Sequence, residues 1–133
     1  YNNINLIYYN TSILYVEIAR KLGIPIKGIN LPNHFIVGYL KNENFSIHQS
    51  IDQYLKDDVI FYINPFSNGV ILKHRDIEDF IKEIKINYNR YYFIPCKFRD
   101  ITKRLLTNLT YSYRNSKNEK IKSDLKNILD LYD

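Results

Sequence analysis

Residues 11–40 decide the fold, and they read TSILYVEIARKLGIPIKGINLPNHFIVGYL. In the first part of this stretch, apolar residues recur at positions 13, 16, 19 and 22, which is the spacing of a helix. Three successive residues just before these positions are suitable N-caps: Asn10, Thr11 and Ser12. Gly23 favours a stop, and Pro25 prevents the helix from continuing. We therefore expect a helix over residues 12–23.

Short β-rich segments follow this helix, separated by turn signals. We predict extended segments at residues 24–31, 34–40, 59–63, 70–72 and 91–94. Pro32 and Asn33 form the turn between the first two, and Asn64 and Pro65 close the third. The segment 45–55 fits neither a helix nor a strand clearly. The pattern as a whole predicts an α+β fold.

Helices are expected again in the second half of the chain. Apolar residues at helical spacing predict one over residues 75–86, with acidic residues in its first turn, where the helix dipole favours them. Two more are predicted at about 98–114 and 119–131, and the short linker between them requires an antiparallel hairpin. Pro95 is the best candidate for a boundary between an α+β core and a helical hairpin. We therefore divide the chain into a core, residues 1–95, and a helical hairpin tail, residues 96–133.

Composition restricts the possible classes of protein. The chain has 133 residues, of which 45% are hydrophobic and 25% charged, so it can bury the core of one domain. Its net charge is +5, and the chain is rich in Ile, Lys, Asn and Tyr, which are residues with AT-rich codons. Mutational bias is therefore favoured over nucleic-acid binding as the explanation of the positive charge. A single cysteine excludes an internal disulfide and a multi-cysteine metal site.

The N-terminus also shapes the expected setting of the protein. The sequence contains no methionine and starts at Tyr1, so we interpret it as a fragment that lacks its natural start. The first ten residues show no signal peptide, and no apolar run is long enough for a membrane span. We expect a cytoplasmic location, no membrane, no metal and no cofactor.

The order of these elements is that of a papain-like cysteine enzyme. In such an enzyme a nucleophile stands at the start of the first helix, where the dipole lowers the pKa of a thiol. A histidine on a following strand acts as the base, and an Asp or Asn on the next strand orients it. His34 begins the second predicted strand, and Asn64 ends the third.

Three motifs carry a resemblance to a known family. TSILYVEIARKLGIP at 11–25, GINLPNHF at 28–35 and FYINPF at 61–66 resemble the SirB1 / transglutaminase-like family of bacteria. The final helices, with KRLLTNL at 103–109, resemble the TPR-like tail of that family. The resemblance implies a transglutaminase-like, papain-like core followed by a TPR-like helical hairpin. It does not by itself imply cross-linking activity.

The resemblance assigns roles to three positions. The nucleophile position falls on Asn10, and an amide cannot attack a carbonyl as a thiolate does. The base position falls on His34, and the orienting position on Asn64, where an Asp is common. Each residue also has a purely structural interpretation, because Asn10 suits a helix cap, Asn64 a turn, and His34 a hydrogen-bonded place in the core.

The remaining candidates are weaker. Cys96 precedes a predicted helix, whose N-terminus favours a thiolate, but it comes after His34, against the order of papain-like enzymes. His48 and His74 lack the spacing of a zinc site. The basic outer face of the hairpin is best explained as a solvated surface.

Three functions from different classes are therefore considered. The first is a catalytically degenerate transglutaminase-like domain that serves as a binding or regulatory module, with an unknown protein partner and oligomeric state. The second is a residual papain-like hydrolase or acyl-transfer enzyme that uses His34 and Asn64, with Cys96 or a water molecule as nucleophile. The third and weakest is a nucleic-acid-binding surface, for which affinity would fall steeply with salt.

Overall fold

The computed structural model describes the backbone of residues 2–41 and 54–132, and the side chains from residue 10 onward within these ranges. Four α-helices lie in these ranges: α1 (Asn2–Lys21), α2 (His74–Glu83), α3 (Phe98–Tyr113) and α4 (Glu119–Asp130). The strands are β1 (Ile26–Leu31), β2 (His34–Leu40), β3 (Val59–Asn64) and β4 (Val70–Leu72). Two short 3₁₀ turns complete the set, η2 (Lys56–Asp58) and η3 (Arg90–Tyr92). The domain is thus mixed helix and sheet.

The four strands form one antiparallel sheet in the order β1-β2-β3-β4. Leu31 at the end of β1 lies opposite His34 at the start of β2, across a tight turn in which Asn33 has a positive φ of 61°. Asparagine tolerates that left-handed conformation better than most residues, which explains its place in the Pro32–Asn33 turn. The turn therefore fixes His34 at one end of the sheet.

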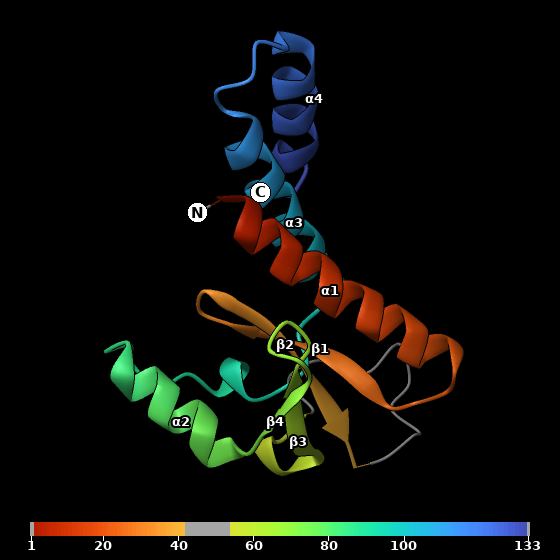
Figure 1. Cartoon of the computed structure of the whole chain (residues 1–133), viewed down its shortest axis with the longest axis vertical. Coiled ribbons are helices and arrows are strands. Elements are labelled where there is room, and N and C mark those ends of the chain that lie inside the picture. Colours follow the sequence, from red (N-terminus) through yellow and green to blue (C-terminus); the bar gives the residue numbers. More distant parts are fainter. Residues whose placement is uncertain (1, 42–53, 133) are drawn as a thin grey trace.

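Helices cover the two faces of the sheet (Figure 1). Alternate side chains of a strand point to opposite faces, and β2 shows this clearly. Ile36 and Leu40 join a core that includes Ile77 of α2. Val37 packs on the other face, in a cluster with Ala19 of α1. Residues of even number in β2, His34 among them, therefore face α2, whereas residues of odd number face α1.

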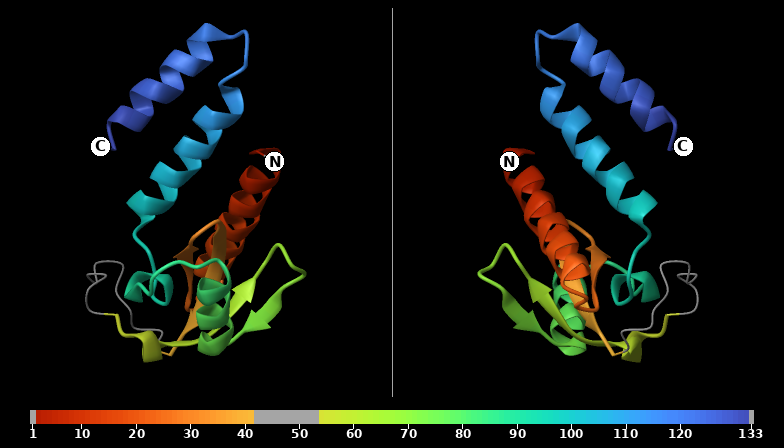
Figure 2. Two further views of the ribbon diagram at one scale, coloured as in Figure 1. Left: turned by 90° about the vertical axis from the view of Figure 1, so that its left-hand side faces the viewer. Right: turned by 90° about the vertical axis from the view of Figure 1, so that its right-hand side faces the viewer.

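The α3–α4 hairpin extends away from the sheet and packs beside α1 (Figure 2). Neither helix contains a fully buried residue within the part of the chain that the structure describes. The sheet and the hairpin are tied together through Arg104 of α3, whose guanidinium donates hydrogen bonds to the side chain of Asn30 and, at 2.8 Å, to the carbonyl of Leu31. Both acceptors belong to β1.

Most predicted elements are confirmed, with boundaries shifted by a few residues. The strands predicted at 34–40 and 70–72 have these limits in the structure, and the third strand extends one residue further, to Asn64. The helix predicted at 75–86 ends at Glu83, because Lys85 takes a left-handed φ of 56°. The ambiguous segment 45–55 lies outside the described residues except for its last two.

Two predictions were wrong. The first helix begins at Asn2 and not near residue 12, so Asn10 lies inside α1 and does not cap it. Ser12 fits within the helix because it is buried and donates a hydrogen bond of 2.6 Å to the carbonyl of Phe35. The stretch 91–94, predicted as extended, starts within the turn η3, where the side chain of Asn89 accepts a hydrogen bond from the backbone amide of Tyr91.

Candidate functional site

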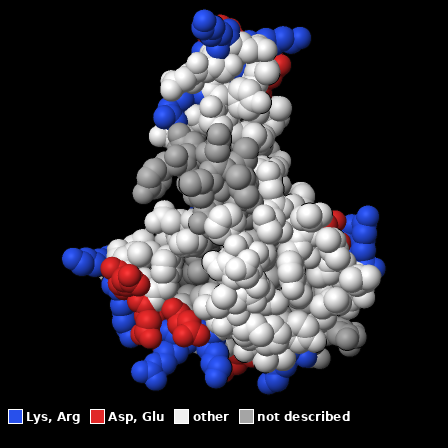
Figure 3. Space-filling model, viewed as in Figure 1, with Lys and Arg blue, Asp and Glu red and all other residues white. Residues whose placement is uncertain are grey.

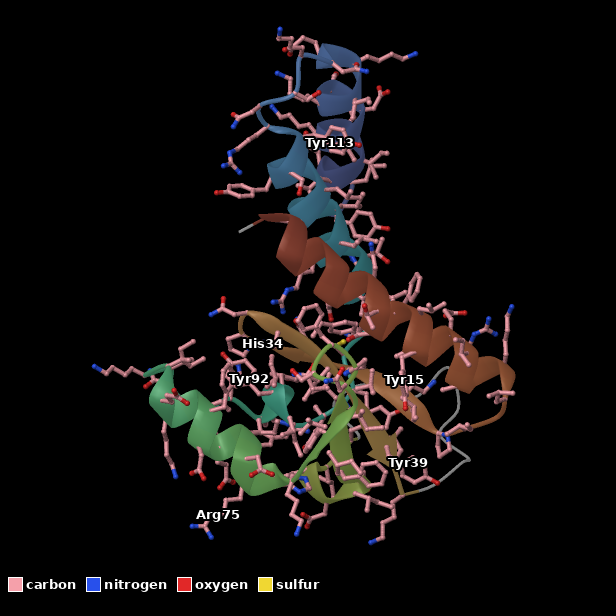
Figure 4. The ribbon with its side chains drawn as sticks, viewed as in Figure 1. Tyr15, His34, Tyr39, Arg75, Tyr92 and Tyr113 are labelled. Carbon is pink, nitrogen blue, oxygen red and sulfur yellow. The ribbon has the colours of Figure 1, made fainter. Side chains whose placement is uncertain are left out.

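His34 lies at the edge of the core between the sheet and α2 (Figure 4). Its ring meets that of Phe80 of α2 edge to face, with 5.2 Å between the ring centroids. Partial burial lowers the pKa of the imidazole below its usual 6.5, because the charged form loses hydration. His34 is therefore neutral at pH 7, which is the state that a general base requires.

Asn64 lies on the same side of the sheet as His34. Val37 of β2 pairs with Ile63 of β3, which places Asn64 one residue further along, on the face that carries Ile36 and His34. A pocket of about 170 Å³ opens there. It is lined by Leu31, His34, Ile36, Asn64, Leu72, Asp76, Ile77 and Phe80. The fold thus brings the predicted base and the predicted orienting residue to one small, mainly apolar pocket.

The side chain of Asn64 stabilises a turn. Its Oδ1 accepts hydrogen bonds from the backbone amides of Phe66, at 3.2 Å, and Ser67, at 3.4 Å. An Asn that orients a catalytic histidine uses this same oxygen to accept the imidazole N–H. In this structure the oxygen stabilises the turn between β3 and β4, a role that asparagine commonly has in turns.

Asp76 is a member of this pocket that the sequence analysis did not identify as such. It stands in the first turn of α2, and its Oδ2 accepts a hydrogen bond of 2.6 Å from the backbone amide of Lys73. The pattern of acidic residues at the start of this helix predicted a dipole interaction but not a place near His34. Its proximity depends on how α2 packs across the sheet, which the local sequence does not reveal.

Asn10, to which the family resemblance assigns the nucleophile position, is not among the described residues that line this pocket. It is exposed and lies two residues before Ser12, the residue of α1 that bonds to Phe35. Two residues turn a helix by about 200°, so Asn10 faces away from the sheet. Moreover, α1 covers the face of the sheet opposite to the one that carries His34. Two of the three predicted site residues therefore come together, and the third stands apart.

Cys96 is also separated from His34. Its backbone amide and its Sγ both donate to the carbonyl of Gly28, at 3.0 and 3.3 Å, along the outer edge of β1. Gly28 pairs with Val37, three residues along the ladder from the pair of Leu31 and His34, which amounts to about 10 Å. Burial, together with the nearby Asp100, raises the pKa of the Cys96 thiol to about 12. The thiol is thus protonated at neutral pH.

The other histidine that the structure describes has a structural role. His74 packs against Tyr62 and Phe93, and its Nε2 lies 2.8 Å from the carbonyl of Lys56. His48 lies outside the described residues. Within the described ranges, no three His, Cys, Asp or Glu side chains are placed to hold a metal ion. Among those same residues, no helix has the length and apolar character needed to cross a membrane.

Comparison with known proteins assigns the chain to a class. A family model described as Transglutaminase-like superfamily matches residues 10–107, from within α1 to within α3, and the chain belongs to this superfamily. It is also 26% identical over 111 residues to a UPF0162 protein of Xylella fastidiosa (strain 9a5c). That alignment covers 79% of this chain and 34% of the relative, so the chain spans about a third of the relative's length. No solved structure matches the chain significantly.

Proposed function

We propose that the chain is a catalytically degenerate transglutaminase-like domain that acts as a binding or regulatory module. The observation that supports this most directly is the lack of a nucleophile at the expected place, since Asn10 is an exposed amide inside α1. Cys96 is the single cysteine of the sequence, and its Sγ donates a hydrogen bond to the carbonyl of Gly28 on β1, whereas His34 is on β2. Burial raises the pKa of this thiol. A covalent mechanism requires an activated nucleophile within hydrogen-bond reach of its base.

The proposal includes a finer assignment of the fold. We assign the sheet and α1 to a papain-like core of the SirB1 type, with His34 and Asn64 at the base and orienting positions. The antiparallel pair α3 and α4 is assigned as a TPR-like hairpin beginning after residue 95. Support comes from the antiparallel packing of the pair and from the lack of fully buried residues in either helix over the described residues. A cytoplasmic setting fits a chain with one cysteine and hence no internal disulfide.

One observation favours an alternative function of the enzyme class. His34 and Asn64 share a pocket with the carboxylate residue Asp76, and His34 is neutral at pH 7. A residual hydrolase or acyl-transfer enzyme would use His34 to activate a water molecule there. The structure gives less support to a nucleic-acid surface. In the view of Figure 3, the positive side chains are scattered at the periphery and are mixed with acidic ones over α2.

Turnover by the wild type and two variants distinguishes these functions. The wild type, His34→Ala and Cys96→Ser are compared for incorporation of a fluorescent primary amine into a glutamine-containing protein and for ester hydrolysis. The degenerate domain predicts that all three equal the reaction without protein. Turnover by the wild type that His34→Ala removes, while the variant stays folded, supports the residual enzyme. Cys96→Ser then identifies whether the nucleophile is the thiol or water.

A further inference from the structure

A second pocket, unrelated to His34, lies between β1, η3 and the start of α3. Its volume is about 490 Å³, within the range of sites that bind small molecules. Its lining residues are Asn30, Asn89, Tyr91, Tyr92, Pro95, Cys96, Lys97 and Asp100. None of them belongs to the described lining of the His34 pocket. Figure 4 labels Tyr92, which the turn η3 brings to this place.

The amide of Asn30 has a fixed orientation in this pocket. Its Oδ1 accepts a hydrogen bond from the guanidinium of Arg104, which donates a second one to the carbonyl of Leu31 at 2.8 Å. A guanidinium has donors only, so the amide must turn its oxygen toward Arg104. The Nδ2 group of Asn30 is then the part of the amide that remains to donate to a ligand.

The side-chain amide of Asn89 also has its oxygen occupied, by a contact with the backbone. Its Oδ1 accepts a hydrogen bond of 3.0 Å from the backbone amide of Tyr91, and Asn89 thereby caps the turn η3. A backbone N–H is also only a donor, so the oxygen of Asn89 is committed to the turn. Both asparagines therefore offer the pocket a hydrogen-bond donor and not an acceptor.

The charges around the pocket favour the same type of ligand. Lys97 is one of its lining residues, and the guanidinium of Arg104 bonds to the side chain of Asn30. Asp100 contributes one carboxylate against these two cations. Burial lowers the pKa of Arg104 to about 10, yet its guanidinium stays charged at neutral pH. The net result is a donor-rich pocket with a small excess of positive charge.

We propose that this pocket binds a small oxyanion, the carboxylate or phosphate group of an organic ligand, through Asn30, Asn89 and Lys97. Charged acceptors form the strongest hydrogen bonds with such donors, and Tyr91 and Tyr92 provide an aromatic wall for the rest of the ligand. This inference is independent of the His34 pocket, and it holds or fails whether or not the domain is an enzyme.

An NMR titration of the ¹⁵N-labelled full chain tests the proposal. Inorganic phosphate, glutamate and citrate are added in separate titrations, with sodium chloride at matched ionic strength as the reference. We expect saturable shifts of the backbone and side-chain amides of Asn30, Asn89 and residues 96–100, and no saturable shift around His34 and Asn64. A response to phosphate alone or to the carboxylates alone identifies which oxyanion the pocket accepts.

Two variants and two matched controls make the test specific. Asn89→Asp keeps the oxygen that caps η3 but replaces the donor with a second anionic oxygen, and Lys97→Gln removes one charge. We expect each to weaken binding about tenfold or more, the effect of losing a hydrogen bond to a charged group. Asn118→Asp changes an Asn that caps α4 in the same way, and Lys117→Gln removes a charge from the α3–α4 linker.

The outcomes are distinct. Binding that falls in the two pocket variants and persists in the two controls supports the proposal. Absence of saturable shifts with all three anions overturns it. Equal weakening in the pocket variants and the controls also overturns it, because it would show that the anions respond only to the net charge of the chain.

Discussion

At the scale of single residues, His34 and Asn64 line one small pocket between the sheet and α2. The imidazole of His34 lies against Phe80, in a pocket where apolar side chains dominate. The amide oxygen of Asn64 holds the turn that follows β3. An Asp at this position would also cap the turn, since both residues favour it. The turn alone therefore accounts for an Asn or Asp here, without a catalytic requirement.

The titration of His34 gives a prediction at this scale. Burial lowers the pKa of the imidazole below 6.5, so the unfolded chain binds more protons at this site than the folded protein when the pH falls below 6.5. The contribution of His34 to the free energy of unfolding is therefore complete above pH 6.5 and declines as the pH falls below it. We expect an NMR titration of the His34 ring to give a midpoint below 6.5.

The variant His34→Phe provides the comparison. Urea denaturation of the wild type and the variant between about pH 5 and pH 7.5 should show a smaller dependence on pH in the variant, since one group that titrates in this range is absent. A His34 pKa at or above 6.5 in the folded protein, or an unchanged pH dependence in the variant, would contradict the burial of the neutral ring.

At the scale of elements, the length of α1 decides what Asn10 does. The helix starts at Asn2, so Asn10 is an exposed residue in its interior. There Asn is a poorer helix former than Ala by several tenths of a kcal/mol. We therefore expect Asn10→Ala to leave the free energy of unfolding unchanged or to raise it by about 0.5 kcal/mol, measured by urea denaturation.

The opposite result has a clear meaning. If Asn10 capped the helix, its replacement by Ala would cost about 1 kcal/mol, because a backbone N–H would lose its acceptor. Asn118→Ala is the positive control, since the side chain of Asn118 accepts a hydrogen bond from the backbone amide of Ile121 at the start of α4. A loss of stability in Asn10→Ala as large as in this control would contradict the position of Asn10 inside α1.

The elements show why the sequence predicted most of the fold. Strands β2 and β4 are bounded by strong turn signals, and α3 and α4 have clear periodicity, so their limits could be predicted to within a residue or two. The start of α1 was missed because Asn10, Thr11 and Ser12 look like caps when only local propensity is considered. Ser12 is tolerated inside the helix by a tertiary contact, its bond to Phe35 on β2.

At the scale of the whole molecule, the sheet separates α1, which contains Asn10, from the face that carries His34. The linear order of the chain suggested that these two would meet. The first helix, the strand with His34 and the strand with Asn64 follow one another as in a papain-like enzyme. However, the even-numbered residues of β2 face α2 and the odd-numbered ones face α1. From the chain order we expected Asn64 to act on His34, and both residues line one pocket. It did not predict the place of Asp76 or the second pocket, which depend on packing between distant segments.

Arg104 connects the hairpin to the sheet at this scale. Its guanidinium bonds to Asn30 and to the carbonyl of Leu31 from a half-buried position. We expect Arg104→Gln to lower the free energy of unfolding by about 1–2 kcal/mol, because these charge-assisted hydrogen bonds are lost. Urea denaturation followed by circular dichroism measures the change.

Arg114→Gln is the control for this prediction. It removes the same charge from an exposed arginine whose hydrogen bond is to Tyr111 of its own helix. We expect it to change stability by less than about 0.5 kcal/mol. Equal effects of the two substitutions would show that Arg104 does not join the hairpin to the sheet.

The central claim is that this transglutaminase-like domain has no thiol nucleophile paired with His34. The rate at which iodoacetamide alkylates Cys96, measured against pH in the wild type and in His34→Ala, tests it most directly and needs no substrate. Because the thiolate is the reactive form and the pKa is about 12, we predict that the rate rises steadily with pH through the neutral range and is the same in both proteins. A rate that levels off at neutral or acidic pH in the wild type, and loses that plateau in His34→Ala, would reveal a thiolate–imidazole pair and contradict the account.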